Sequence, residues 1–516
     1  MKARLGRLAQ SRWSAFGLAL LAGAAAGLAH PPFGFLPGLL GFGLLLHLLD
    51  GGAGWRAAFA RGWAAGFAYF LVGTWWVGEA FMVDAAAHAW QAPFAVMLLP
   101  GGLALFWGAA AVVYRRIAPP DARRVLAFAA VFGAFEWLRG HVLTGFPWDL
   151  PGEAWAAGSA PSQTAALVGA YGLSLITLGI AATPGLGWRP RPLLCAAVAL
   201  TLAWGGGAWR LANAETGATG LMVRVVQPDI PQAVKWSPAE FGAIVQRYLT
   251  LTSAPAARRP DVVIWPEAAL PAPAGELISP EWWVRPALEK TLRPGQTLLM
   301  GAYRTEGPDE RLRYYNSLIA LRRTANGLDV TGAYDKQRLV PFGEYLPLEG
   351  LFSRIGLKKL VSVGESFTPG PQPMPISPMG LPRLQPLICY ESLYPGLADD
   401  GGQRPAWIVN VSNDAWFGRT SGPWQHFNLA SYRAIEAGLP LVRATPTGVS
   451  GLIDAYGRPL RRMGPGRSGV IDALLPEAAS PTPYSTWGDG PFFALTIVAL
   501  ACSRRPRARM RSTHQM

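Results

Sequence analysis

Long uncharged apolar blocks fill the first 210 residues of the chain, and one more lies near its C-terminus. A helix needs about 20 apolar residues to cross the hydrocarbon core of a bilayer. The blocks therefore predict eight membrane-spanning helices, at approximately 13–29, 32–49, 60–78, 93–114, 125–143, 164–187, 192–209 and 488–503. The first block follows basic residues, as a signal peptide does. Because further blocks follow closely and no clear cleavage site stands out, we interpret it as a retained helix.

From about residue 211 the pattern changes to short apolar runs that alternate with amphipathic segments. Helices are predicted near 238–254, 280–291 and 424–437, and strands at 222–227, 262–265, 297–301, 315–321, 384–389, 406–412 and 440–444. Several of these strands are apolar throughout, which is typical of strands buried on both faces. The pattern predicts a layered α/β domain over residues 211–486, between the seventh and eighth spans. The segment 338–382 is assigned no element.

Charge gives the orientation of the spans. The chain carries 46 Lys and Arg against 32 Asp and Glu, and the basic residues flank apolar blocks rather than gather on one groove-binding element. We therefore expect no nucleic-acid partner. The loops 79–92 and 144–163 contain acidic residues but no Lys or Arg. The positive-inside rule then places both termini in the cytoplasm, with 504–516 as a basic cytoplasmic tail and the α/β domain on the opposite side.

Candidate chemistry lies where three strands of this domain end. The chain has three cysteines, which is no disulfide framework, and Cys195 and Cys502 fall within apolar blocks. Cys389 instead ends an apolar strand before a Pro/Gly turn, Glu267 follows the strand 262–265, and Lys336 lies beside another turn. A thiol, a carboxylate base and a fixed cation are the groups that acyl transfer through a thioester requires. The alternative for Cys389 is a buried structural cysteine.

Other polar residues are interpreted more simply. A Cys–His pair would suggest His426 as a base, but it lies at a helix start among aromatic residues and is interpreted as structural. Asn413 and Asp414 are interpreted as turn formers. No cluster has metal-ligand spacing and no Gly-rich phosphate loop is present, so we expect neither a metal nor a cofactor.

Two features of the predicted membrane part are also singled out. Glu136 and Arg139 lie at helical spacing within the fifth span, where charged residues usually face protein or water. They form either a pair within the helix or a polar wall at which lipid headgroups enter. The following segment, 144–148, is interpreted as an interfacial aromatic anchor.

Several short sequence motifs resemble those of a known family. Trp265-Pro-Glu267, Lys336 and Cys389 match, in order and context, the Glu-Lys-Cys triad of the nitrilase superfamily. Longer matches are Tyr334-Asp-Lys-Gln-Arg-Leu-Val-Pro-Phe-Gly-Glu-Tyr-Leu-Pro347, Cys389-Tyr-Glu391, Asn410-Val-Ser-Asn-Asp-Ala-Trp-Phe-Gly418 and Pro423-Trp-Gln-His-Phe427. With eight predicted spans around one outer domain, the chain resembles the apolipoprotein N-acyltransferases, the membrane-bound family of that superfamily.

The resemblance implies a fold and a set of roles. The fold is an α-helical transmembrane bundle of about eight spans with a periplasmic nitrilase-like α-β-β-α sandwich. Cys389 is then the nucleophile that carries a fatty acyl thioester, Glu267 the general base, and Lys336 the cation that stabilises thiolate and oxyanion. The supporting roles go to four further residues: Glu344 as a second carboxylate at the site, Tyr390 as a backbone N–H donor to the oxyanion, Glu391 as the residue that positions the loop, and Trp236 as an aromatic residue of the substrate site. The alternatives are a turn-capping role for Glu344, a surface salt bridge for Glu391 and a packing role for Trp236.

The resemblance also implies substrates and a location. The donor is a membrane phospholipid such as phosphatidylethanolamine, which gives up its sn-1 chain, and the acceptor is the α-amino group of an S-diacylglyceryl-cysteine at an apolipoprotein N-terminus. The enzyme is expected to work in a bacterial inner membrane as a monomer. One alternative is a membrane-anchored amidase with the same triad, which would not need eight spans. The other is a transporter or receptor with a degenerate outer domain, which predicts loss of triad residues.

Overall fold

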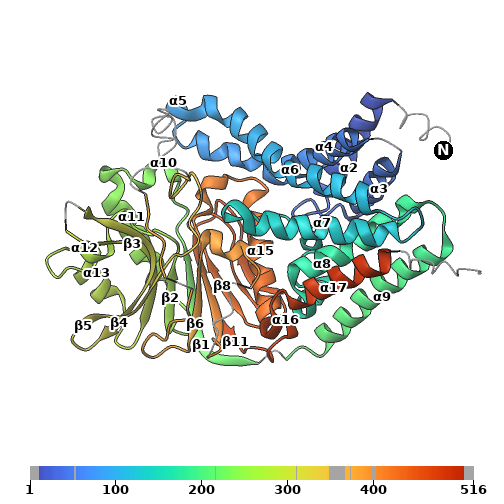
Figure 1. Ribbon diagram of the computed structural model, residues 1–516. Coiled ribbons are helices and arrows are strands. Elements are labelled where there is room, and N and C mark those ends of the chain that lie inside the picture. Colours follow the sequence, from blue (N-terminus) through green and yellow to red (C-terminus); the bar gives the residue numbers. More distant parts are fainter. Residues whose placement is uncertain are drawn as a thin grey trace, which may run out of the picture.

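The computed structural model describes residues 11–51, 54–215, 217–308, 311–347, 366–371, 373–396 and 403–504. Within these residues a helical part lies beside a part built from two β-sheets and their covering helices (Figure 1). The basic residues before Ser11 and the tail 505–516, both predicted to be cytoplasmic, lie outside the described residues.

Each of the eight predicted spans contains a helix. The helices are α2 (Arg12–Gly27), η1 with α3 (Leu36–Leu40 and Gly41–Asp50), α4 (Trp55–Thr74), α6 (Ala92–Ile117), α7 (Arg124–His141), α8 (Ala165–Ala182), α9 (Pro190–Ala212) and α17 (Gly490–Ser503). Among the described residues, four helical segments are long and apolar enough to cross a membrane: Ala85–Ile117, Arg124–Thr144, Pro161–Leu186 and Pro190–Ala212. Leu36–Asp50 and Gly490–Ser503 are apolar but shorter. The number of spans stays a prediction.

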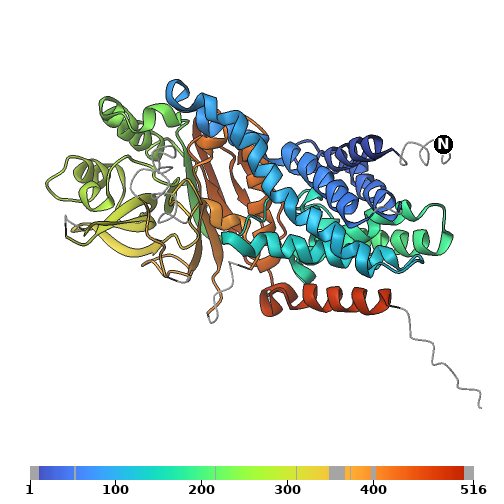
Figure 2. The ribbon, with the colours of Figure 1, turned by 45° about the horizontal axis from the view of Figure 1, so that its top comes forward.

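Small residues let the helices of this part approach closely. A Cβ atom added to Gly23 of α2 would lie 1.8 Å from the carbonyl oxygen of Ala65 in α4. One added to Gly62 of α4 would lie 2.5 Å from the carbonyl oxygen of Trp107 in α6. Such contacts between backbones are how helices gain packing energy in lipid, where no hydrophobic force drives them together. Figure 2 shows α17 on the outside of the part, where Trp137 of α7 donates a hydrogen bond to Asp489 at 2.8 Å.

Two mixed sheets form the α/β part. The first has the order β11-β1-β2-β3-β4-β5, with β1 (Ala218–Gln227), β2 (Val262–Trp265), β3 (Thr297–Glu306), β4 (Arg313–Thr324), β5 (Gly327–Asp335) and β11 (Gly469–Pro476). The second has the order β10-β9-β8-β7-β6, with β6 (Leu384–Ile388), β7 (Trp407–Val411), β8 (Leu441–Ala444), β9 (Ser450–Ile453) and β10 (Pro459–Met463). Neighbouring strands pair in parallel within β1-β2-β3 of the first sheet and within β6-β7-β8 of the second.

Alternation along the strands builds four layers. Val262 and Ile264 of β2 point inward and pack in one cluster with Val409 and Val411 of β7. The intervening Val263 and Trp265 pack outward with side chains of α11 (Phe241–Thr252) and α13 (Val284–Thr291). Helix α15 (Gly422–Ala437) covers the outer face of the second sheet through Ala430 and Ala434. The predicted α-β-β-α sandwich is confirmed.

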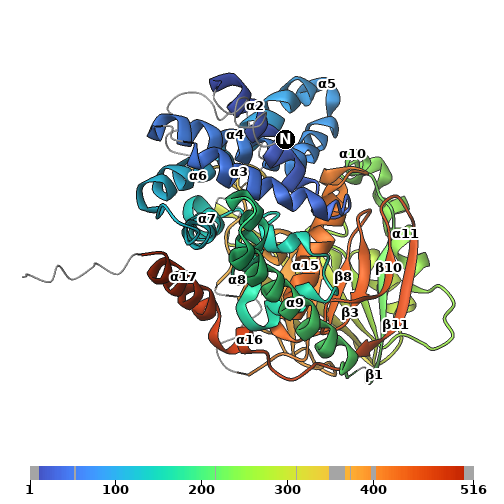
Figure 3. The ribbon, with the colours of Figure 1, turned by 90° about the vertical axis from the view of Figure 1, so that its right-hand side faces the viewer.

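Helix α15 also forms the junction with the helical part, and it lies between β8 and α8 (Figures 1 and 3). Tyr432 and Ile435 of α15 pack against Ala165, Ala166 and Leu173 at the start of α8. Polar groups close the same junction, since the backbone N–H of Ala170 donates to Glu436 at 2.9 Å. A helix buried on both sides ties the sheets rigidly to the membrane part.

The predicted interfacial anchor is wrong. Trp148 is 2% exposed, and its ring lies 4.6 Å from that of Trp76 and 5.9 Å from that of Phe417, measured between centroids. The indole N–H groups of Trp76 and Trp148 both donate to Gln425 of α15, at 3.0 and 3.2 Å. The aromatic residues fill the junction between the two parts instead of facing lipid.

Glu136 and Arg139 form a pair within α7, with 2.5 Å between Arg139 Nη2 and Glu136 Oε2. Both side chains are buried, so the alternative of a polar wall for lipid headgroups is wrong. Trp107 donates to Glu136 at 2.7 Å, and Arg139 donates to the carbonyl oxygen of Trp148 at 3.0 Å. The pair therefore holds the segment that follows α7.

Candidate active site

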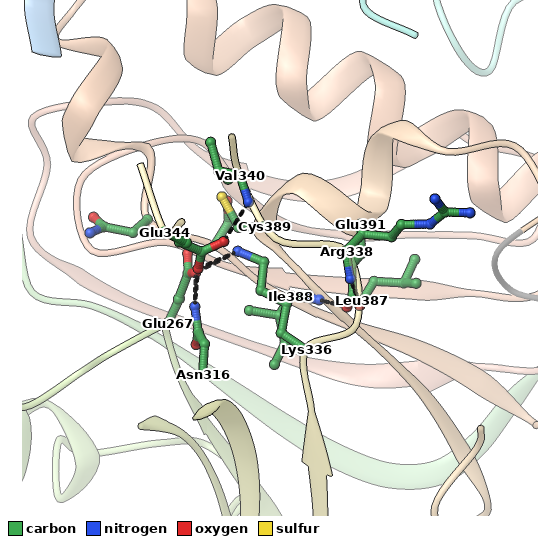
Figure 4. A network of polar contacts seen from close by, with 12 residues as sticks. Glu267, Asn316, Lys336, Arg338, Val340, Glu344, Leu387, Ile388, Cys389 and Glu391 are labelled. Carbon is green, nitrogen blue, oxygen red and sulfur yellow. Dashed lines mark hydrogen bonds and ion pairs between the residues drawn. The ribbon is translucent and has the colours of Figure 1, made fainter. Parts of the chain in front are cut away.

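The three triad residues follow strands that end at the same side of the sandwich. Glu267 lies two residues after β2, Lys336 directly after β5, and Cys389 directly after β6. Because the two sheets pack face to face, residues from both reach one site. Figure 4 shows the Cys389 thiol, the Lys336 ammonium and the carboxylates of Glu267 and Glu344 gathered there.

Lys336 is the centre of the charged network. Its Nζ lies 3.2 Å from Glu267 Oε1 and 2.9 Å from Glu344 Oε1. The amide of Asn316 donates to the same two oxygens, at 2.7 and 2.8 Å. Burial disfavours the ammonium, but the carboxylates of Glu267 and Glu344 more than offset this and hold the pKa of Lys336 well above its usual range. Lys336 is therefore a fixed positive charge.

Glu267 has the ionisation state and the unpaired carboxylate oxygen that a base needs. Burial acts to raise its pKa, but Lys336 and Asn316 together lower the pKa of Glu267 below its usual value. Those two partners occupy Oε1, while Oε2 has no hydrogen-bond partner among the described residues. An ionised carboxylate with one free oxygen is placed to accept a proton.

Cys389 lies at a sharp turn between β6 and a 3₁₀ helix, η11 (Cys389–Leu393). Its φ of 49° is in the left-handed region, which costs about 1–3 kcal/mol for a non-glycine residue and occurs mainly at functional sites. Burial and the nearby Glu267 raise the pKa of its thiol to about 12, although Lys336 opposes the rise. The thiol is therefore protonated at neutral pH and needs a base to become a nucleophile.

Glu391 holds this turn in place. One of its carboxylate oxygens accepts from the backbone N–H of Ile388 at 2.8 Å. The other accepts from the Tyr334 hydroxyl and the Gln337 N–H, both at 2.8 Å, and from the Arg338 N–H at 3.2 Å. Its side chain is fully buried, which excludes the alternative of a surface salt bridge. Glu391 thus connects the Cys389 turn to the segment that carries Lys336.

The predicted supporting residues lie at different places. Glu344 joins the triad network through Lys336, as described. The Tyr390 hydroxyl donates to the carbonyl oxygen of Gly145 at 2.6 Å and so attaches the Cys389 turn to the segment that follows α7. The contribution of its backbone N–H to an oxyanion hole stays a prediction. Trp236 is 52% exposed, with its ring 6.1 Å from that of Tyr303, and its role also stays a prediction.

His426 supports the turn and lies beneath it. Its Nδ1 lies 2.9 Å from Asp414 Oδ1, and its Nε2 lies 3.2 Å from the carbonyl oxygen of Cys389 and 3.0 Å from the Ser392 hydroxyl. Burial lowers the pKa of His426. The structural interpretation of His426 agrees with these contacts. Asp414 is more than a turn former, because it also pairs with Arg443 at 2.9 Å.

Two buried residues of the site were not predicted. Asn316, which bridges Glu267 and Glu344, lies within an apolar strand, and its amide there was the available signal. The Nζ of Lys235 lies 3.4 Å from the carbonyl oxygen of Glu267, and the signal for this residue in the sequence was its place next to Trp236. In the described part of the chain, no group of three or more His, Cys, Asp or Glu is arranged to hold a metal ion.

Comparison with known proteins covers both parts of the chain. Residues 22–183 match a family model described as the apolipoprotein N-acyltransferase N-terminal domain, and residues 222–484 match one described as carbon-nitrogen hydrolase. A relative from Caulobacter vibrioides, named apolipoprotein N-acyltransferase, is 55% identical over 97% of this chain and 96% of its own. A relative of the same name from Rhodopseudomonas palustris is 37% identical over 96% of each chain. Among solved structures, a mutant amidase of the nitrilase superfamily from Nesterenkonia AN1 covers 55% of this chain and 98% of its own, at 19% identity and a TM-score of 0.37.

Proposed function

The chain belongs to the apolipoprotein N-acyltransferases, membrane enzymes of the carbon-nitrogen hydrolase superfamily, and we propose that it moves a fatty acyl chain in two steps through a thioester on Cys389. The observation that carries this proposal is the site itself. A protonated thiol, a carboxylate with one free oxygen and a fixed ammonium lie together at the ends of β2, β5 and β6. The amidase alternative is not favoured.

In the first step Glu267 Oε2 accepts the proton of the Cys389 thiol, and the thiolate attacks the sn-1 ester carbonyl of a glycerophospholipid such as phosphatidylethanolamine. Lys336 and the backbone N–H of Tyr390 stabilise the negative oxygen of the tetrahedral intermediate. The C–O bond of the ester then breaks. The lysophospholipid leaves as an alcohol after taking the proton from Glu267, and the acyl chain remains on sulfur.

In the second step the α-amino group of an S-diacylglyceryl-cysteine attacks the thioester carbonyl. Glu267 accepts the proton that the amine must lose, and this proton returns to the sulfur as the C–S bond breaks. The products are an N-acylated lipoprotein and the free thiol. Trp236, half exposed and next to Lys235, is proposed to contact substrate.

We further propose the location of each part. The helices of residues 1–210 and 487–503 lie in a bacterial inner membrane, residues 211–486 lie in the periplasm, and both termini, with the tail 504–516, lie in the cytoplasm. The protein acts as a monomer. The loop charges support this orientation. The junction at α15 supports lateral entry of the donor, since it fixes the site close to the helical part.

The proposal is tested by transfer assays in detergent micelles that contain fluorescent phosphatidylethanolamine and a diacylglyceryl-cysteine peptide. The wild-type protein should label the peptide, whereas Glu267→Gln, Lys336→Met and Cys389→Ala should not. The exposed Lys290→Met on α13 is the matched control and should transfer normally. Labelling by Cys389→Ala would overturn the thioester, and ammonia release from small amides without peptide labelling would favour the amidase.

A further inference from the structure

A second buried lysine lies beside the proposed base. Lys235 is the last residue of the short helix α10 (Gln232–Lys235), and it is 2% exposed. Its Nζ donates to the backbone carbonyl oxygen of Glu267 at 3.4 Å. Lysines are almost never fully buried unless they are paired, because an ammonium loses its favourable hydration when it is removed from water. Among the described residues, no carboxylate lies within ion-pair distance of Lys235.

The charges around Glu267 suggest a role for the buried ammonium of Lys235. The groups that face the Glu267 carboxylate are Lys336, Glu344, the Cys389 thiol and Lys235. Without Lys235, two carboxylates would share the single charge of Lys336, and the site would favour uptake of a proton by one of them. Burial lowers the pKa of Lys235 to about 8, with Glu267 opposing the change, so the amine still carries most of its charge at neutral pH.

We propose that Lys235 is a positioning residue for the base: its ammonium holds the backbone at Glu267 and supplies the second positive charge that keeps this carboxylate free to accept the thiol proton. The inference rests on the proposed role of Glu267. It assigns Lys235 no contact with substrate, which separates it from the neighbouring Trp236.

The test is the pH dependence of Cys389 acylation. Because the pKa of Glu267 lies below that of a free glutamate, single-turnover acylation by fluorescent phosphatidylethanolamine is followed between about pH 3 and pH 8 for the full-length protein and its variants. The rate falls on the acid side as the base becomes protonated. An opposite charge at close range lowers a carboxyl pKa by about 1–3 units, and Lys235 lies beyond ion-pair distance of the carboxylate. Lys235→Met should therefore move the acid limb upward by no more than about one pH unit, the lower end of that range, and leave the plateau at higher pH nearly unchanged.

Two conservative variants separate charge from packing. Lys235→Arg keeps the charge and should keep the acid limb in place. Lys235→Gln keeps a hydrogen-bond donor without the charge, and its limb should move as in Lys235→Met. These two variants decide the matter even if Lys235→Met does not fold. Lys290→Met, on the surface, should leave the profile unchanged.

The inference is overturned if Lys235→Gln leaves the limb in place, or if its rate falls equally at every pH, as loss of packing alone would cause. Glu267→Gln distinguishes this failure from that of the proposed function. Absence of acylation in Glu267→Gln at every pH keeps Glu267 as the base whatever Lys235 does. A limb that persists in Glu267→Gln removes Glu267 as the base, and the inference with it.

Discussion

Removal of the Lys336 charge should separate the stability of the site from its chemistry. In Lys336→Met the ammonium that lies 2.9 Å from Glu344 and 3.2 Å from Glu267 is lost. All three side chains are at most 12% exposed, so water does not replace the lost partner. Breaking a buried ion pair from one side costs about 3–5 kcal/mol, because a buried charge is left uncompensated. The variant should unfold more easily by about that amount.

Acylation should fall further than stability alone explains. Loss of one group that stabilises an oxyanion costs a factor of about 10²–10³ in rate. Loss of the cation also raises the pKa of Glu267, which reduces the fraction of this base that is ionised as pH falls. Unfolding is followed by tryptophan fluorescence in detergent, and acylation by single turnover with fluorescent phosphatidylethanolamine.

The double variant Lys336→Met/Glu344→Gln is the decisive comparison. It removes one of the two uncompensated carboxylates, so it should regain part of the lost stability, by about 1–3 kcal/mol. It should not regain acylation, because no cation faces the reacting carbonyl. Wild-type stability in Lys336→Met, or recovered acylation in the double variant, would refute this reasoning.

Three further outcomes follow from the same site. Glu391→Gln places an NH₂ group against N–H donors, so the nucleophile turn should loosen and kcat fall with little change in KM, as steady-state transfer assays measure. Tyr390→Phe should cost about 1 kcal/mol in unfolding free energy, because Tyr394 still donates to the Gly145 carbonyl at 3.0 Å, whereas the double variant Tyr390→Phe/Tyr394→Phe should lose more than the sum of the single losses. Burial acts to raise the pKa of Glu267, but Lys336 and Asn316 lower it overall. Acylation should therefore persist at pH values that protonate a free glutamate and disappear only as pH falls through the lowered pKa of Glu267. Single-turnover rates measured over a pH series check this outcome.

Much of the fold could be predicted because short local patterns of apolar and turn residues specify its strands and helices. Strand β2 was predicted with its observed ends, and β6 within one residue, because each is an apolar run closed by a turn. Strands β5 and β9 to β11 were not predicted. They carry polar or exposed positions, such as Arg461 and Arg462 in β10, and depend on antiparallel neighbours rather than on an apolar run.

The positions of Glu267, Lys336 and Cys389 could be predicted for the same reason, since each follows a recognisable strand or turn, and their catalytic roles stay a proposal. The rest of the site depends on contacts between distant segments. Asn316 and Lys235 become residues of the site only because the fold brings β4 and α10 next to Glu267. Trp148 has the sequence context of an interfacial residue, and only the docking of α15 buries it.

The central claim is tested most directly by the mass of the intact protein after incubation with phosphatidylethanolamine, with Cys389→Ala measured alongside. The account predicts a mass increase of one fatty acyl chain on the wild-type protein, none on Cys389→Ala, and loss of the increase when a diacylglyceryl-cysteine peptide is added. A folded, lipid-supplied protein that gains no acyl chain would contradict the thioester. An acyl chain that the peptide cannot remove would contradict the proposed acceptor.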